Sequence, residues 1–423
     1  MKGSPPPAAA QVTLANWQVP PYNRWSFSHI REIMPTQRIS RGIGAVTPLP
    51  ADPQPLGKVA LHRVSGTEAI VDDVLEDTYT DAVVVVHGGR VVLERYSGET
   101  AVDTPHLLMS ISKSVVSCVA GNLVQRGLLS PTHLVTDYVP ELGSSGYQGA
   151  GVRDVLDMRS GVEFSEDYTD LDAEVRVIEE AMGWRPASHP EVPTSLYSYL
   201  TTLGRSGEHG GVFAYRSCET DVLGWVCERA ARTRMADLIS EFLWSPLGAE
   251  RDAEITCDSL GTAVHDGGMC ATARDLARFG VMLLAGGELA GRRIVPGDWL
   301  RESWSVTPDL RDAFARSASG PYLPGGWYRN KFWFLPRPHG DVLLCLGING
   351  QMLYVSPATG TVVAKLSSWP DAQSPAMLHD TLRAFDAIGA ALADLPADET
   401  TRRQGLPGVV AGLSRGRISG KRR

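Results

Sequence analysis

One serine and one lysine have the spacing and the surroundings that nucleophilic catalysis requires. Ser110 and Lys113 stand three residues apart in the segment 107–125, where Lys113 is the only charged side chain. Residues i and i+3 share a helix face, so the Ser110 hydroxyl and the Lys113 amine can come within hydrogen-bonding reach. We expect burial to lower the pKa of Lys113 and keep part of its amine neutral, and a neutral amine can accept the serine proton.

The spacing of this pair is weak evidence by itself, because a serine three residues before a lysine often arises by chance. The segment supplies stronger evidence, since its apolar and small neutral side chains predict a helix buried on all sides. A lysine in such a helix needs a partner or a function. The alternative interpretation is that Lys113 pairs with a buried acid while Ser110 only caps or packs.

Strand and helix patterns elsewhere predict the body that positions this helix. Five runs are rich in β-branched or apolar residues and bounded by turn residues: 82–86, 91–93, 342–348, 351–356 and 361–368. Gly88-Gly89 separates the first two and predicts a tight hairpin. An amphipathic helix that follows Ser374-Pro375 would cover one sheet face. We therefore predict an α+β fold, with an antiparallel sheet of about five strands flanked by helices.

The middle of the chain changes to short helical patterns, including 220–231 and 272–284, which predict a helical second lobe. We predict four parts: a wrapped N-terminal arm at 1–58, a sheet-and-helix lobe at 59–130 and 250–395, a helical lobe at 131–249 and a basic tail at 396–423. A nucleic-acid-binding tail is the alternative to a disordered one, and composition favours disorder.

The composition limits the class of protein. Hydrophobic residues make up 43% and charged residues 21% of 423 residues, which excludes wholesale disorder. The net charge of -8 argues against binding to nucleic acid or to an anionic membrane. The six cysteines lie far apart without metal-ligand spacing, so we expect buried thiols and no metal. Without an apolar run of signal or membrane-spanning length, we expect a cytoplasmic protein.

At the Ser110 helix the chain resembles the serine β-lactamase and DD-peptidase superfamily. Within it, the chain is most similar to 6-aminohexanoate-dimer hydrolases, which cleave nylon oligomers, and it also resembles β-lactamase-like carboxylesterases. The similar segments are 17–25, 79–82, 107–110, 154–161, 272–280 and 365–371. The resemblance implies a β-lactamase-like fold and an acyl-enzyme mechanism without a cofactor.

The resemblance also implies a third catalytic residue and an oxyanion hole. The family's second motif is a tyrosine followed two residues later by Asn or Ser, and Tyr215-Arg216-Ser217 matches it. A phenol beside a cationic lysine can return a proton to the leaving group. The third motif, a cation, a hydroxyl residue and a glycine, is reduced to Cys345-Leu346-Gly347, which disfavours β-lactams and D-Ala-D-Ala peptides. The backbone N–H groups of Ser110 and Ile348 would form the oxyanion hole.

Five further residues are candidates for substrate binding: Tyr168, Glu179, Asp266, Trp327 and Trp333. The resemblance implies the first three. Glu179 has an alternative interpretation as part of a solvated acidic stretch, in which Glu166, Asp167, Asp170, Asp172 and Glu174 are all expected to face solvent. Trp327 and Trp333 would wall an apolar acyl slot or cover the sheet edge.

Taken together, these features predict a serine hydrolase that cleaves ester or amide bonds of small linear substrates. The predicted partner is a small molecule, with no nucleic acid and no membrane, and a homodimer is an open alternative to a monomer. Two other functions remain open. One is a β-lactamase or DD-peptidase, and the other is a non-catalytic binding protein on the same scaffold.

Overall fold

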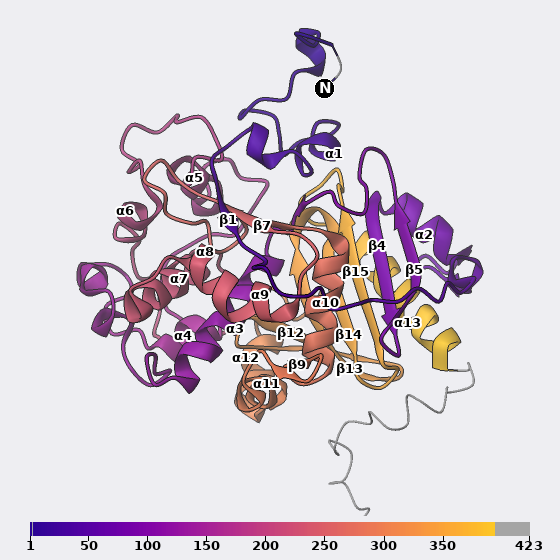
Figure 1. The fold of residues 1–423 in the computed structure, drawn as a ribbon. Helices are drawn as coiled ribbons and strands as arrows, with labels where there is room; N and C mark the ends of the chain where they lie inside the picture. The colour runs from indigo at the N-terminus through magenta and orange to yellow at the C-terminus, as the bar shows by residue number, and fades with distance from the viewer. Residues whose placement is uncertain (2, 394–423) are drawn as a thin grey trace, which may run out of the picture.

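The predicted hairpin is present in the computed structural model, which describes residue 1 and residues 3–393 (Figure 1). Strands β4 (Thr80–His87) and β5 (Arg90–Tyr96) pair antiparallel, with His87 opposite Arg90. Gly88 and Gly89 form the turn with φ of 54° and 75°. Two consecutive positive φ angles match the right-handed twist of a hairpin, and glycine adopts them without strain.

This hairpin ends a seven-stranded antiparallel sheet in the order β11-β12-β13-β14-β15-β4-β5. The other strands are β11 (Trp327–Arg329), β12 (Phe332–Arg337), β13 (Gly340–Gly347), β14 (Gln351–Ser356) and β15 (Thr361–Ser367). The sequence predicted about five of the seven and missed β11 and β12. The first is only three residues long, and Pro336 interrupts the pattern of the second. Strand β11 pairs only with residues 332–334, so Pro336 lies beyond the part of β12 that it covers.

Helices cover both faces of this sheet, and the alternation of valines in β4 shows how. Val84 and Val86 lie in one hydrophobic cluster with Phe279 of helix α10 (Ala273–Leu284). Val83 and Val85 point the other way, into a cluster with Phe385 of helix α13 (Pro375–Ala393). Figure 1 shows α10 and α13 on opposite sides of the sheet. The period of two along the strand therefore separates two cores.

A second, four-stranded sheet lies next to the candidate nucleophile. Its order is β1-β7-β8-β6, and its strands are β1 (Thr36–Ile39), β7 (Ala253–Thr256), β8 (Met269–Ala271) and β6 (His106–Leu107). Strand β6 leads through Leu108 and Met109 into helix α3 (Ile111–Gln125). Every residue of α3 from Ile111 to Leu123 is buried, which confirms the prediction of a helix enclosed on all sides.

The helices predicted at 220–231, 272–284 and after Pro375 are confirmed as α7 (Cys218–Ala231), α10 and α13. Other helices are α1 (Asn23–Ser26), α2 (Val71–Asp77), α4 (Val152–Leu156), α5 (Glu174–Ala181), α6 (Leu196–Leu200), α8 (Met235–Ile239), α9 (Ser245–Leu247), α11 (Gly297–Trp304) and α12 (Pro308–Ala315). Short strand pairs are β2 (Ala60–His62) with β3 (Glu68–Ile70), and β9 (Glu288–Leu289) with β10 (Arg292–Arg293). The division into lobes stays a prediction, and the predicted tail at 396–423 lies outside the described residues.

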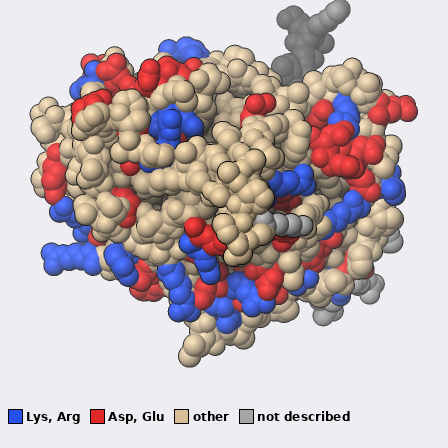
Figure 2. Space-filling model, turned by 90° about the horizontal axis from the view of Figure 1, so that it is seen from above, with Lys and Arg blue, Asp and Glu red and all other residues tan. Residues whose placement is uncertain are grey.

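The surface and the cysteines agree with the composition. On the face drawn in Figure 2, acidic and basic side chains are interspersed around a largely uncharged centre. All six cysteines are buried and free, as predicted. Among the described residues, no helix has the length and apolar character needed to cross a membrane.

Candidate active site

Ser110 lies at the turn between strand β6 and helix α3. It occupies the N-cap position of α3, rather than the helix interior that the sequence predicted, and it is 8% exposed. The residue before it, Met109, has a φ of 47° although it is not glycine. Strained backbone of this kind costs about 1–3 kcal/mol and persists only where the surroundings enforce it. The turn therefore holds Ser110 in a fixed position at the start of a buried helix.

Lys113 reaches back along α3 to Ser110, as predicted. Its Nζ donates hydrogen bonds to Ser110 Oγ at 2.7 Å, to Ser217 Oγ at 3.2 Å and to the main-chain oxygen of Asp266 at 2.8 Å. The carboxylate of Asp266 also lies within 3.4 Å of Nζ. Lys113 therefore contacts both the buried acid Asp266, which the alternative interpretation expected, and Ser110.

The charge of Lys113 differs from the prediction. Burial lowers its pKa, but the negative charges of Tyr215 when it is ionised and of the Asp266 and Glu166 carboxylates outweigh burial, so the pKa lies above its ordinary value. The expectation of a partly neutral amine is therefore wrong for the free protein. At neutral pH Lys113 carries a proton that must leave before the amine can act as a base.

Tyr215 lies on the other side of the lysine, just before helix α7. The Lys113 Nζ is 5.3 Å from the centre of the Tyr215 ring, and the ring packs against Trp333 with centroids 5.0 Å apart. Burial raises the pKa of the phenol, while the charge of Lys113 and the hydroxyl of Ser110 partly offset that increase. The phenol is thus protonated at neutral pH and has a proton to give.

Glu166 is a candidate site residue that sequence reasoning missed. The expectation that it faces solvent is wrong, because its carboxylate accepts hydrogen bonds from Ser217 Oγ at 2.6 Å, from the Ser217 N–H at 2.9 Å and from the Tyr168 hydroxyl at 2.7 Å. Burial raises its pKa, and Lys113 and these hydrogen bonds counteract that effect. Nothing in the acidic stretch distinguishes Glu166 from its neighbours, so only its contact with the Tyr-x-Ser motif could have revealed it.

A small cleft opens in front of Ser110. Its lining residues are Met109, Ser110, Tyr168, Val175, Ile178, Glu179, Met182, Trp184, Ser217, Asp266, Gly267 and Ile348. The structure therefore brings together Tyr168, Glu179, Asp266 and Ile348 as predicted. Most of the other walls are apolar, and Trp184, which sequence reasoning missed, supplies the aromatic one.

The two tryptophans predicted to bind substrate do not line this cleft. Trp327 stacks on Phe334 with ring centroids 5.0 Å apart and is 1% exposed, so it belongs to the core beside the sheet. Trp333 packs behind the ring of Tyr215. The packing interpretation therefore describes both residues, because strands β11 and β12 direct them into hydrophobic clusters.

Glu179 also lines the cleft, and basic residues surround it. Its carboxylate accepts hydrogen bonds from Arg176 at 2.9 Å and Gln18 at 3.1 Å, and Arg185 lies 3.9 Å away. Burial raises the pKa of Glu179 to about 7, although Arg176 and Arg185 lower it. The second oxygen, Oε2, has no hydrogen-bond partner in the described chain, and neither has Oδ1 of Asp266.

Gly347 allows the end of strand β13 to approach the Ser110 turn closely. A Cβ at this position would lie 2.7 Å from the Leu108 oxygen and 2.9 Å from the Met109 Cβ. The next residue, Ile348, lines the cleft. The N–H groups of Ser110 and Ile348 take no part in the hydrogen bonds between loops of the described chain. Two N–H groups are thus available at one end of the cleft.

Comparisons with known proteins agree with this arrangement. The Beta-lactamase sequence family matches residues 68–387. The chain belongs to the β-lactamase family. It is 39% identical over 391 residues to a 6-aminohexanoate-dimer hydrolase of Paenarthrobacter ureafaciens, a match that covers 91% of this chain and 97% of the relative.

Solved structures extend the likeness to the β-lactamase fold. A Bacillus anthracis protein described as a candidate 6-aminohexanoate-dimer hydrolase superposes with a TM-score of 0.84 at 27% identity, over 93% of this chain and 100% of that chain. A family VIII carboxylesterase shares the fold alone, with a TM-score of 0.55 at 16% identity over 75% of this chain and 96% of that chain. The resemblance stated from the sequence is confirmed, and the chain is a serine hydrolase.

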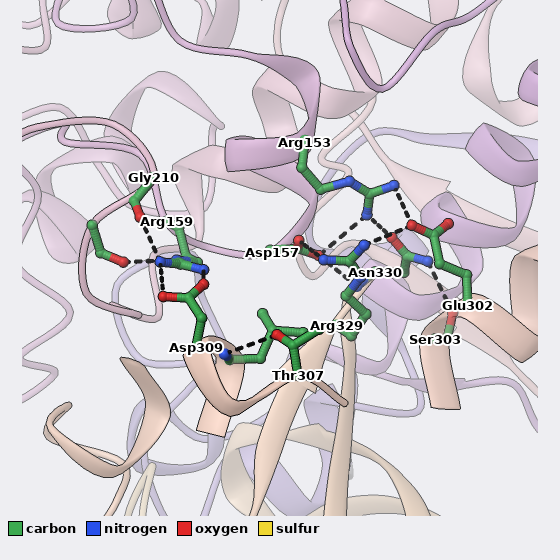
Figure 3. Close-up of polar contacts among 12 residues, drawn as sticks. Arg153, Asp157, Arg159, Gly210, Glu302, Ser303, Thr307, Asp309, Arg329 and Asn330 are labelled. Carbon is green, nitrogen blue, oxygen red and sulfur yellow. Dashed lines mark hydrogen bonds and ion pairs between the residues drawn. The ribbon is translucent and has the colours of Figure 1, made fainter. Parts of the chain in front are cut away.

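In this β-lactamase-family chain, a polar network fixes helix α3 against the turn between strands β11 and β12. The turn between β11 and β12 accepts hydrogen bonds from α3, because Ser114 Oγ donates to the Lys331 oxygen at 2.8 Å and Ser117 Oγ to the Asn330 oxygen at 2.6 Å. Asp157 holds that turn by accepting from the Asn330 N–H at 3.0 Å and from Arg329 at 2.7 Å (Figure 3). The helix that carries Lys113 is therefore anchored to the seven-stranded sheet through this turn.

Proposed function

We propose that the chain hydrolyses small esters and linear amides, with Ser110 as nucleophile, Lys113 as base and Tyr215 as acid. The observation that carries this proposal is the 2.7 Å contact between Lys113 Nζ and Ser110 Oγ at the floor of the cleft. A serine hydroxyl is a weak nucleophile until an adjacent base accepts its proton. In this site Lys113 is the group placed to do so.

In the proposed reaction Ser110 Oγ attacks the substrate carbonyl carbon while its proton passes to neutral Lys113. The oxyanion that forms would accept hydrogen bonds from the N–H groups of Ser110 and Ile348. Tyr215 then protonates the leaving alcohol or amine and recovers a proton from Lys113. Water attacks the resulting acyl-enzyme and gives its proton to the same base, which returns the proton to Ser110 Oγ as the acid leaves.

The cleft supports a substrate with an apolar acyl chain, because Val175, Ile178 and Trp184 form its walls. The unpartnered oxygens of Glu179 and Asp266 would accept an ammonium group, which the dimer of 6-aminohexanoate carries. Glu179 is already paired with Arg176, however, and this pairing favours uncharged esters over the zwitterionic dimer, whose ammonium group would need a free carboxylate. We therefore expect ester hydrolysis to be faster than hydrolysis of the dimer.

The test is a substrate panel together with covalent labelling. Purified protein is assayed against p-nitrophenyl esters, 6-aminohexanoate dimer and nitrocefin, and treated with a fluorophosphonate probe. We expect ester turnover and a stoichiometric adduct that is lost in Ser110→Ala. A non-catalytic binding protein would show neither, and turnover that persists in Ser110→Ala would assign the nucleophile elsewhere. Fast nitrocefin turnover would favour a β-lactamase.

Cytoplasmic residence is a separate proposal. The six free, buried thiols support it, because disulfides are rare in reducing compartments.

A further inference from the structure

We propose that Glu166 is a proton acceptor for Lys113 and that the hydroxyl of Ser217 relays the proton between them. This inference rests on the proposed role of Lys113 as base. It addresses the charge of that lysine, which is cationic in the free protein and cannot accept the Ser110 proton in that state.

The geometry is a continuous chain of two hydrogen bonds. Lys113 Nζ donates to Ser217 Oγ at 3.2 Å, and Ser217 Oγ donates to Glu166 Oε1 at 2.6 Å. The Ser217 N–H donates to the second carboxylate oxygen of Glu166 at 2.9 Å, which fixes the carboxylate against the start of α7. Asp266 offers a direct but longer contact of 3.4 Å between Oδ2 and Nζ.

The transfer conserves atoms and charge. One N–H bond of Lys113 breaks and its proton binds to Ser217 Oγ, while the original Ser217 proton moves to Glu166 Oε1. An ammonium and a carboxylate thus become a neutral amine and a carboxylic acid, and Ser217 remains a hydroxyl. The number of protons in the site is unchanged, so the neutral amine forms without exchange with solvent.

The surroundings of Glu166 favour this exchange. Burial makes the ionised carboxylate less stable and raises its pKa, so a proton from Lys113 is better accepted here than by an exposed glutamate. The titratable groups that face Glu166 are Lys113 of α3, Tyr168 of its own loop, Tyr215, and Cys218 of α7. Lys113 is the cation of this group.

Tyr168 connects the relay to the cleft. Its hydroxyl donates to the same oxygen, Glu166 Oε1, at 2.7 Å, and its side chain lines the cleft. A substrate that accepts the Tyr168 hydrogen bond would withdraw one of the donors that stabilise the Glu166 carboxylate. Proton acceptance by Glu166 would then increase when the cleft is occupied.

The test compares pH–rate profiles for a p-nitrophenyl ester, whose leaving group needs no protonation. In the wild type the exchange is internal, so kcat/KM is expected to be flat from pH 7 to 9. In Glu166→Gln the relay has no acceptor, and loss of the Lys113 proton to solvent becomes the pH-dependent route to the neutral amine. We expect kcat/KM to be roughly hundredfold lower at pH 7 and to rise about tenfold per pH unit. The matched control is Glu163→Gln, an exposed acid of the same loop, which should keep the wild-type profile.

Ser217→Ala provides an independent variant, because it removes the relay and leaves both end groups. It should show the same alkaline shift, and the double variant should lose no more than either single one, as expected for residues that act as a unit. A Glu166→Gln profile that stays flat, or losses that add in the double variant, would overturn the relay. If the wild type itself forms no Ser110 adduct, the proposed function fails instead.

Discussion

The indole Nε1 of Trp17 donates a hydrogen bond of 2.8 Å to the main-chain oxygen of Trp184. The two rings also meet edge to face, with centroids 5.3 Å apart. Trp184 lines the cleft, whereas Trp17 lies in the N-terminal segment, about ninety residues before Ser110. Gln18, the next residue, donates to Glu179 in the same cleft. The N-terminal segment therefore supports the part of the cleft that Trp184 and Glu179 line.

Trp17→Phe should weaken the support of Trp184 in the cleft wall while an aromatic ring still fills most of the buried space. Phe keeps an aromatic ring but loses the N–H, so we expect a loss of about 1 kcal/mol in stability. KM for a p-nitrophenyl ester should rise severalfold while kcat changes little, because Trp17 does not touch Ser110. Steady-state kinetics and the thermal midpoint measure both effects. Trp25→Phe is the control, because it alters a partly exposed ring stacked on His29. An equal rise in KM in that variant would contradict a specific role of Trp17 in supporting the cleft.

Gly347→Ala should move the end of strand β13, and with it the proposed oxyanion-hole residue Ile348, relative to Ser110. The backbone of Gly347 has a φ of -125°, which alanine adopts freely, so the effect is steric. The added methyl would meet the Leu108 oxygen at 2.7 Å, and relief of such overpacking costs about 1–3 kcal/mol. We expect kcat to fall at least tenfold with a smaller change in KM, since the proposed oxyanion contact strengthens in the transition state.

The control for that substitution is Gly143→Ala. No heavy atom lies within 4 Å of a Cβ built at Gly143, so both kcat and the thermal midpoint should match the wild type. A Gly347→Ala variant with unchanged kcat would show that the approach of β13 to the Ser110 turn does not matter for the reaction.

Asp157→Asn tests the hydrogen-bond network that joins helix α3 to the turn between β11 and β12. Asp157 has a side chain that is 3% exposed and accepts from Arg329 and from the Asn330 N–H. Asn removes the charge that pairs with Arg329, but Arg329 keeps Glu302 at 2.6 Å as its other carboxylate partner, so we expect a cost of about 1–3 kcal/mol. Asp309 in the same view pairs with Arg159 but is 66% exposed, so Asp309→Asn should cost less than about 1 kcal/mol (Figure 3). Equal thermal midpoints for the two variants would refute this ranking.

The sequence predicted those parts of the molecule in which local pattern and burial agree. The Gly88-Gly89 hairpin, the buried helix around Lys113 and the helix after Pro375 each had a clear local signal, and all three are present. Strands β11 and β12 lacked that signal because one is short and the other contains proline. The sequence therefore left two interpretations of Trp327 and Trp333 open, a wall of the acyl slot and packing on the sheet, and strand pairing turns both side chains into hydrophobic clusters.

The candidate site was predictable only where residues lie close in sequence or in a known motif. The Ser110–Lys113 contact follows from helix spacing, but the charge of Lys113 depends on Glu166 and Asp266, which lie 53 and 153 residues away. Glu166 has the same residue type as its solvent-exposed neighbours. Only the fold brings it against Ser217, so its contact could not be inferred from composition.

The buried carboxyl of Glu179 predicts a pH dependence of stability. In the folded protein burial raises its pKa to about 7, whereas its ordinary value is 4.5. Between these two pH values the folded chain binds more protons at this residue than the unfolded chain. Ionisation of Glu179 therefore destabilises the fold progressively as pH rises from about 4.5 to about 7. Below pH 4.5 this destabilisation is absent, and above pH 7 it is complete.

Glu179→Gln removes this titration while keeping the shape of the side chain. At pH 4.5 Glu179 is protonated in the folded protein, so the variant, with a neutral side chain of similar shape, is expected to be about as stable as the wild type. By pH 8 its stability relative to the wild type should have increased by up to about 3 kcal/mol, from about 1.4 kcal/mol per pKa unit. Thermal midpoints of both proteins at pH 4.5, 6 and 8 give the comparison, and Glu163→Gln should show no such trend because Glu163 is exposed. A midpoint difference that is constant over this range would mean that Glu179 stays ionised throughout, held by its two arginines.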